Sequence, residues 1–273
     1  MTLRSLLYVP AHSERFIAKA HERGADAIIL DLEDSVPEAD KDAARANLAT
    51  AVPSVGQAGA QVFVRVNVGP RQREDALAAC RAGAGGLLIP KAASTGALES
   101  LAGTLRAEEA SLGRPAMNFI ATIEDPAALL DARAIAGVHR VIGLCLGSED
   151  FALAIGATPT PDVLRHPKLM LHYAAKAAGK LSLGLLRSIA DYSDLTALTE
   201  AAREARLHGF DGATCVHPSA VPVLNAAFQP SDEERTWAAR VLAEAASHSG
   251  AFELDGRMID APVLARARRI AES

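Results

Sequence analysis

The sequence predicts a (β/α)8 barrel, the TIM-barrel class of α/β fold, followed by a C-terminal helical extension. Short apolar runs alternate with longer amphipathic segments along the whole chain, which is typical of βα units in a parallel sheet. Eight such runs are present, and the chain of 273 residues is close to the length of about 250 that such a barrel uses. No G-x-G-x-x-G segment follows an apolar run, as an open dinucleotide-binding sheet would need; the glycine-rich residues 83–86 precede one instead.

Eight strands are predicted, each from an apolar run that ends in polar or turn residues. In chain order they cover Leu6–Val9, Ala27–Leu32, Val62–Asn67, Gly86–Pro90, Asn118–Ile123, Val141–Leu146, Leu181–Leu186 and Gly212–Val216. Because the runs are apolar almost throughout, we expect strands buried on both faces, as in a parallel sheet covered by helices.

Amphipathic segments between the strands predict the helices. They cover Ser13–Arg23, Glu38–Ala49, Arg73–Ala82, Thr95–Glu109, Pro126–Ile135, Lys168–Ala178 and Asp194–Leu207. Several begin with a capping residue or an early proline, as Ser13 and Pro126 illustrate.

The chain continues beyond the eighth strand for longer than closing a barrel requires. Asp232–Ser247 reads as a helix with acidic residues in its first turn, Gly250–Asp260 follows, and Pro262–Ala271 predicts a short basic helix. We therefore expect a catalytic barrel over residues 1–230 and a helical extension over residues 231–273.

Composition excludes several classes of protein. The net charge is −5 and the basic residues are scattered, which disfavours a nucleic-acid-binding protein. Three cysteines in apolar surroundings give neither a disulfide framework nor a zinc spacing. No apolar run reaches the length of a membrane span, and the first residues do not resemble a signal peptide. We expect a soluble, cytoplasmic protein.

Polar residues gather where the predicted strands end, which is the catalytic end of a (β/α)8 barrel. The residues concerned are Asp31, Glu33 and Asp34 after strand two, Arg65 and Asn67 at strand three, Lys91 after strand four, Glu124 and Asp125 after strand five, Glu149 and Asp150 after strand six, and His217 after strand eight. We expect these side chains to share one rim.

Glu124 and Asp150 follow adjacent strands, so their carboxylates should stand side by side. Adjacent carboxylates repel each other unless one is protonated or a cation bridges them. Oxygen ligands with few protein donors suit Mg²⁺, which keeps waters and takes other ligands from substrate. The alternative is that acids at these positions cap the following helices, and we favour that role for Asp125 and Glu149.

The run Asp31-Leu32-Glu33-Asp34 reads either as a solvated loop or as a site element. If the strand continues, side chains alternate in direction, so one pair of these residues should point inward. Glu33 or Asp34 would then hold metal-bound water.

Arg65 and Lys91 are cations at strand ends, where an unpaired charge would be costly. Arg65 must meet either a substrate oxygen or one of the rim carboxylates. Lys91 is either a Schiff-base lysine or a charge complementing the nearby acids, and we favour the second role because those acids keep its amine protonated. His217 is either a structural group or a ligand contact.

Several segments together resemble the citrate lyase β-subunit-like branch of the HpcH/HpaI aldolase family. In order they are RSLLYVPAHSERFIAKA, DAIILDLEDSVP, VFVRVN, LLIPKA, ATIEDP, LCLGSEDFALAIG, GFDGATCVHPSAVPVLNAAFQPSDEE and DGRMIDAP. The likeness extends from Arg4 almost to the C-terminus.

This resemblance implies a Mg²⁺-dependent lyase that acts on a hydroxyacyl thioester. Glu124 and Asp150 match the family's metal ligands, and Arg65 matches an arginine that contacts the substrate acid or the thioester oxygen. Glu33 and Asp34 match acids near the metal waters. The resemblance also implies a homo-oligomer, a trimer or a dimer of trimers, in which the C-terminal extension packs on a neighbour and brings Asp260 to its site.

Three departures from the family pattern bear on substrate binding. Ala213 stands where the family often has a lysine, and Ala11 stands where it often has glycine. The segment LSLGLLRSIADYSD around strand seven also differs from the common pattern, so we expect a difference in substrate choice. For the phosphates of coenzyme A, Arg15 and Lys19 are the candidate contacts, since both lie on the helix after strand one.

The function predicted is cleavage or formation of a carbon–carbon bond in citryl-, malyl- or citramalyl-coenzyme A by a retro-Claisen or aldol mechanism. Arg65 would stabilise the enolate that departs. Two alternatives stay open on the sequence: an aldolase acting on 2-keto-3-deoxy acids without coenzyme A, and a β subunit that needs the carrier protein of a citrate lyase complex. The acyl group, the direction and the number of subunits are also open.

Overall fold

A computed structural model describes residues 3–187 and 194–272 of the chain. The chain divides into two compact units, Met1–Asn225 and Ala226–Ser273. The first is a barrel and the second is a small helical unit, and each is described by itself below. In the described ranges, no helix is both long enough and apolar enough to cross a membrane.

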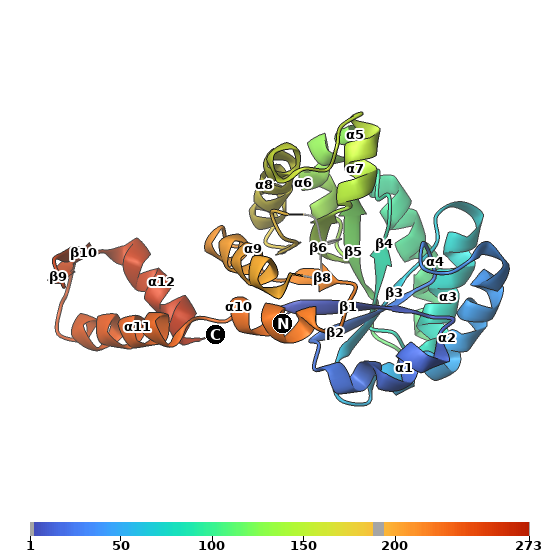
Figure 1. The fold of residues 1–273 in the computed structure, drawn as a ribbon, viewed down its shortest axis with the longest axis horizontal. Helices are drawn as coiled ribbons and strands as arrows, with labels where there is room; N and C mark the ends of the chain where they lie inside the picture. Colours follow the sequence, from blue (N-terminus) through green and yellow to red (C-terminus); the bar gives the residue numbers. More distant parts are fainter. Residues whose placement is uncertain (1–2, 188–193, 273) are drawn as a thin grey trace. The chain divides into compact units, whose positions relative to one another are not determined.

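Eight parallel strands form the barrel of the first unit, as predicted (Figure 1). They are β1 Ser5–Pro10, β2 Ala27–Asp31, β3 Gln61–Arg65, β4 Gly86–Ile89, β5 Asn118–Ile123, β6 Val141–Leu146, β7 Leu181–Leu183 and β8 Ala213–Cys215. Each strand pairs with the next from β1 to β7, and β1 pairs with β8. A parallel bridge between Leu183 and Gly212 joins β7 to the β8 edge and completes the circle.

The barrel interior is a packed apolar core. Residues of successive strands, among them Leu6, Ile29, Phe63, Leu88 and Ile120, are at most 1% exposed and belong to one cluster. Apolar side chains on both faces explain why the strands read as nearly continuous hydrophobic runs. The core therefore fills the barrel below the polar strand ends. The polar side chains that could carry out a reaction lie at the C-terminal rim of the barrel.

Five strands end earlier than predicted, among them β4 at Ile89 and β8 at Cys215, each by one residue. β2 ends at Asp31 instead of Leu32, because the Asp31 carboxylate accepts hydrogen bonds from the amides of Glu33 and Ser35, at 2.9 and 3.2 Å, and turns the chain. β3 ends at Arg65 instead of Asn67. β7 ends at Leu183 instead of Leu186, where Gly184 takes a φ of 145° that ordinary residues avoid. The residues 188–193 of the segment predicted to differ from the family lie outside the described part of the chain.

Helices follow the strands around the barrel (Figure 1). They are α1 Glu14–Ala20, α2 Lys41–Gly56, α3 Gln72–Ala82, α4 Thr95–Leu112, α5 Pro126–Leu130, α6 Ala132–Ala136, α7 Ser148–Ala154, α8 Pro161–Ala177, α9 Leu195–Leu207 and α10 Ala220–Ala227.

Several of these helices differ from their predicted bounds. α2 continues past Ala49 to Gly56, because residues of its last turns, including Val52 and Val55, are buried. The predicted helix Pro126–Ile135 is two helices that meet at Asp131. α8 begins at Pro161, well before Lys168, and α4 runs on to Leu112.

The second unit has its own small core. α11 (Asp232–Ala245) and α12 (Ala261–Ala271) pack against each other, and the hairpin β9 (Phe252–Leu254) and β10 (Arg257–Ile259) connects them. α11 begins with a capping box between Ser231 and Glu234. The buried residues of this core are Ala238, Val241, Ile259, Ala267 and Ile270. This compact unit begins at Ala226, whereas the extension was predicted to begin at residue 231.

Candidate active site

A cavity of about 540 Å³ lies at the C-terminal ends of the strands. Its polar wall carries Asp31, Asp34, Arg65, Glu124 and Asp150, which come from the ends of β2, β3, β5 and β6. Its other wall comes from β7, β8 and α8 and is mostly apolar. The structure therefore brings most of the predicted site residues to one place.

Glu124 directly follows β5, and Asp150 lies in the first turn of α7, just after β6. The ends of these two strands are in register, with Ile123 opposite Leu146. Burial and then the charge of Asp150 raise the pKa of Glu124 to about 7. Two carboxylates thus lie close enough for one to oppose the ionisation of the other.

Gly147 makes room for the Glu124 side chain. A Cβ atom at position 147 would lie 2.5 Å from Cγ of Glu124, closer than real Cβ contacts allow, and 3.1 Å from its Oε1. The amide of Gly147 also donates to the carbonyl of Ile123, at 2.9 Å. The Glu124 carboxylate can occupy its place because residue 147 has no side chain, and the sequence analysis missed this dependence.

Lys91 lies beside the same carboxylates. Its ammonium is 3.9 Å from Oδ1 of Asp150, and both side chains are about half exposed. The backbone amide and the charge of Lys91 both act to lower the pKa of Glu124, against the larger effects of burial and Asp150. Lys91 itself has a φ of 48°, an uncommon conformation for a residue with a side chain. Its position suits a charge that complements the acids.

Arg65 is surrounded by carboxylates. Nε and Nη2 each donate to a different oxygen of Asp31, both at 2.6 Å, which is a bidentate pair. Nη1 lies 2.9 Å from Oδ2 of Asp34 and 2.9 Å from Oε2 of Glu33. Arg65 was predicted to meet either a substrate oxygen or a rim carboxylate. The structure shows ion pairs with three rim carboxylates.

Asp31 is the anchor of this arrangement. Its side chain is 1% exposed, and in addition to Arg65 it accepts hydrogen bonds from the Ser35 hydroxyl and from the amides of Glu33 and Ser35. The bonds from Arg65 and Ser35 hold the pKa of Asp31 below its usual range, although burial acts in the opposite direction. From the sequence, no separate role was predicted for Asp31.

Glu33 and Asp34 differ in exposure. The Glu33 side chain is 11% exposed and that of Asp34 is 75% exposed, yet both contact Arg65. The expectation of strict alternation along this run fails because β2 ends at Asp31 and the following residues form a turn. Burial raises the pKa of Glu33 to about 7, and the charges of Asp34 and Glu124 act in the same direction.

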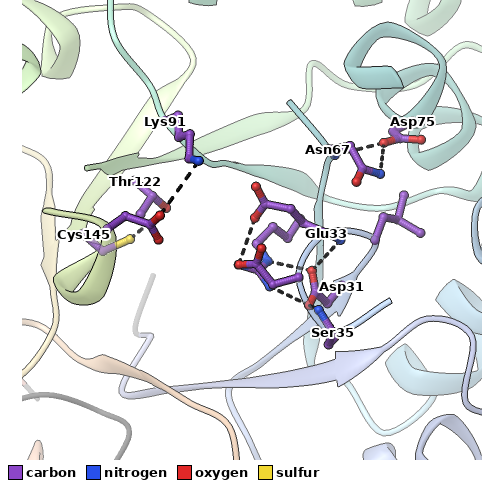
Figure 2. A network of polar contacts seen from close by, with 12 residues as sticks. Asp31, Glu33, Ser35, Asn67, Asp75, Lys91, Thr122 and Cys145 are labelled. Atoms are coloured by element: carbon purple, nitrogen blue, oxygen red, sulfur yellow. Dashed lines mark hydrogen bonds and ion pairs between the residues drawn. The ribbon is translucent and has the colours of Figure 1, made fainter. Parts of the chain in front are cut away.

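Lys41 holds the turn that carries Glu33. Its ammonium donates to the carbonyls of Leu32 and Glu33, at 3.1 and 2.9 Å, and to Oδ1 of Asn67, at 2.6 Å. Asn67 is in turn held by the buried carboxylate of Asp75, at 2.8 Å (Figure 2). This network of polar contacts was not predicted, because its members lie far apart in the sequence.

The remaining predicted residues lie elsewhere. Arg15 and Lys19 are exposed on α1 and do not line the cavity. Asp260 lies in the second unit, where its carboxylate caps α12 by accepting from the amide of Val263 at 3.2 Å. His217 is exposed, and its Nδ1 lies 2.7 Å from the hydroxyl of Ser219.

Helix capping was predicted for Asp125 and Glu149, the acids next to the candidate ligands. Asp125 caps α5 by accepting from the amide of Ala128 at 2.9 Å, which confirms its predicted role. Glu149 lies in the first turn of α7, where an acid favours the helix dipole, and Gly147 is the N-cap residue of this helix.

Lys168 lines the cavity and was not predicted as a site residue. It is 5% exposed and lies on α8 at the spacing of the buried residues Leu164, Leu171 and Ala175. A lysine at an apolar position of a helical repeat is the signal that could have revealed it.

Comparison with known proteins gives the family. Residues 4–218 match the family model described as HpcH/HpaI aldolase/citrate lyase. The chain belongs to this family. The family predicted from the sequence motifs is therefore confirmed.

Individual relatives are similar over nearly the whole chain. A citrate lyase subunit beta-like protein of Mycobacterium tuberculosis is 34% identical over 96% of this chain and 92% of its own length. A (3S)-malyl-CoA thioesterase of Cereibacter sphaeroides is 34% identical over 97% of this chain and 92% of its own length.

A solved structure shares the fold. The crystal structure of CitE from Mycobacterium tuberculosis, in complex with magnesium, acetoacetate and coenzyme A, superposes with a TM-score of 0.84 at 34% identity. The match covers 100% of this chain and 99% of the other.

Proposed function

We propose that this protein is a Mg²⁺-dependent carbon–carbon lyase that cleaves or forms a hydroxyacyl-coenzyme A thioester, with Glu124 and Asp150 as the metal ligands. The observation that carries the proposal is the pairing of these two carboxylates at the cavity, where burial and then repulsion from Asp150 raise the pKa of Glu124 to about 7. A divalent cation between them would remove that repulsion.

The donor set fits Mg²⁺. Among residues 3–187 and 194–272, no group of three or more His, Cys, Asp or Glu side chains is arranged to hold a metal ion, so the site offers two carboxylates. Two carboxylates with waters and substrate oxygens are what Mg²⁺ typically uses. When bound, the ion would act as a Lewis acid on the hydroxyl and carboxylate oxygens of a 2-hydroxy acid.

The residues around the pair supply the remaining functions. Glu33, with its pKa raised to about 7, can accept the hydroxyl proton of the substrate at a carboxylate oxygen near neutral pH. The bond between the carbinol carbon and the α-carbon of the thioester then breaks, and its electron pair passes to the thioester enolate. Arg65, held in place by Asp31, stabilises the charge that develops on the enolate oxygen.

The enolate takes a proton at its α-carbon, which yields an acetyl thioester and a 2-keto acid. We assign this proton transfer to Asp260 of a neighbouring subunit in a homo-oligomer, a trimer or hexamer in the cytoplasm. Oδ1 of Asp260 accepts from the amide of Val263 at 3.2 Å, so Oδ2 would carry this proton. Arg15 and Lys19, both exposed on α1, are the candidate contacts for coenzyme A phosphates.

Thioester cleavage by the purified protein tests the function. Citryl-, malyl- and citramalyl-coenzyme A are offered with and without Mg²⁺, beside 2-keto-3-deoxy acids, and release of the keto acid is measured. We expect Mg²⁺-dependent cleavage of at least one thioester and a loss of at least about a hundredfold in Glu124→Gln and Asp150→Asn. Glu108→Gln, which breaks a surface ion pair with Arg81, is the matched control.

Full Mg²⁺-dependent cleavage by Glu124→Gln would overturn the assignment of the ligand. Cleavage of the deoxy acids alone would favour an aldolase without coenzyme A. A protein inert on every coenzyme A ester but active on a carrier-bound thioester would favour the β subunit of a citrate lyase complex. Release of coenzyme A without a keto acid would indicate a thioesterase.

A further inference from the structure

The apolar wall of the cavity contains one cationic side chain. Residues of β7, β8 and the neighbouring loops form this wall, among them Leu183, Leu185, Phe210, Ser182 and Thr214. Lys168 lines the same cavity from α8. Arg65 is the other cation that the structure places in the cavity lining, and three carboxylates already contact it.

Burial of Lys168 is unusual for its chemistry. Its side chain is held among the apolar residues of α8, with the residue 5% exposed, although lysine is among the residue types least often buried. A buried ammonium loses hydration and is tolerated where partners replace the water. The helix face would be better packed with leucine or methionine, so stability of the fold alone does not account for a lysine here.

The contacts of the Lys168 ammonium leave it able to donate hydrogen bonds to a further anion. Nζ donates to the backbone carbonyl of Arg187 at 2.9 Å, and an ammonium has three hydrogens to donate. Glu149 contributes a favourable charge interaction, yet burial outweighs it and lowers the pKa of Lys168 to about 8. The ammonium is therefore charged at neutral pH and only partly compensated.

We propose that Lys168 determines substrate specificity by binding a second carboxylate on the acyl chain of the substrate. The inference rests on the proposed lyase function, because one carboxylate and the hydroxyl are needed at the Glu124 and Asp150 end of the cavity. The keto acid released would then be a dicarboxylate. The phosphates of coenzyme A are a poorer match, because most of the residues of α8, β7, β8 and the neighbouring loops that line the cavity with Lys168 are apolar.

Binding of two keto acids tests the inference without catalysis. Calorimetry in the presence of Mg²⁺ compares oxaloacetate, which has the second carboxylate, with pyruvate, which lacks it. We expect the unmodified protein to bind oxaloacetate at least about tenfold more tightly, the effect of one charged hydrogen bond. Lys168→Met should remove most of this preference and leave pyruvate affinity within about twofold, while Lys168→Arg should keep part of it.

Lys176→Met is the matched control, because Lys176 lies on the same helix, is paired with Asp211 at 2.6 Å and does not line the cavity. It should keep the preference for oxaloacetate. Equal affinity for the two keto acids in the unmodified protein would overturn the inference, and this measurement does not depend on a variant that folds. An unchanged preference in Lys168→Met would overturn it as well.

Two outcomes separate this inference from the proposed function. If the preference depends on Lys168 but no thioester is cleaved, the specificity assignment stands and the lyase proposal fails. If Lys168→Met weakens binding of coenzyme A and leaves the keto-acid preference intact, Lys168 serves a phosphate and the inference is wrong.

Discussion

The guanidinium of Arg65 and the carboxylate of Asp31 form a bidentate pair, with both N–O distances at 2.6 Å. Asp31 is the last residue of β2 and Arg65 the last residue of β3, and the two residues are partners in the strand register. The pair therefore follows directly from the alignment of two strands. It fixes the guanidinium in a plane at the mouth of the barrel and leaves Nη1 to face Glu33 and Asp34.

Asp31→Asn should lower both stability and activity. The carboxylate is 1% exposed, and removing its charge would leave Arg65 partly buried beside an amide, at a cost of about 3 kcal/mol in the free energy of unfolding. We expect kcat/KM to fall by about a hundredfold, because the guanidinium loses its fixed orientation. Denaturant unfolding and steady-state kinetics measure the two effects.

Asp26→Asn is the control for that variant. Asp26 forms a similar ion pair with Arg4 at 2.6 Å, and neither residue lines the cavity. This control should lose stability while its activity stays close to that of the unmodified protein. Equal losses of activity in both variants would mean that Asp31 acts only through stability.

Gly147→Ala should weaken Mg²⁺ binding. The added methyl group would lie 2.5 Å from Cγ of Glu124 and push the carboxylate away from Asp150. We expect the concentration of Mg²⁺ for half-maximal activity to rise by about tenfold or more, in keeping with small displacements of a ligand. Gly96→Ala on α4 is the control, because a Cβ there meets no atom within 4 Å. A Gly147→Ala protein with unchanged Mg²⁺ affinity would refute this account.

Stabilisation by Mg²⁺ should depend on pH. The pKa values of Glu33 and Glu124 are about 7 in the folded protein, above the ordinary value of 4.5, so the folded state binds these protons more tightly than the unfolded state. Their protonation therefore stabilises the metal-free protein at low pH, and this contribution is lost as the pH rises from about 4.5 through 7.

Mg²⁺ competes with these protons, so it should raise the melting temperature more at pH 8 than at pH 6. A thermal shift series with and without Mg²⁺ measures the difference. In Glu124→Gln the effect of Mg²⁺ should largely disappear at both pH values. An equal shift at pH 6 and pH 8 in the unmodified protein would contradict the assignment of Glu124 as a ligand that loses a proton.

Lys41→Met should reduce activity by displacing the turn that carries Glu33. The ammonium of Lys41 holds the carbonyls of Leu32 and Glu33, so its loss frees this turn. We expect kcat/KM to fall by about tenfold, with a shift in the acidic limb of the pH profile that reports Glu33. Lys41→Arg should recover part of the activity. A profile that falls uniformly without a shift would indicate a purely structural role.

The eight strands could be predicted from the sequence because buried parallel strands are continuous apolar runs, such as Ala27–Asp31 and Asn118–Ile123. Helix ends were less predictable. α2 continues beyond Pro53 because burial of its last turns outweighs local preference. The helix predicted over residues 126–135 is divided at Asp131.

The sequence by itself determined the barrel, the family and the position of acids and cations at the strand ends, since these depend on local patterns and on where each strand stops. Only the tertiary structure decided that Arg65 pairs with Asp31, that Glu124 needs Gly147 beside it, and that Lys168 reaches the cavity. These are contacts between segments far apart in the chain, and strand register and helix packing set them in three dimensions.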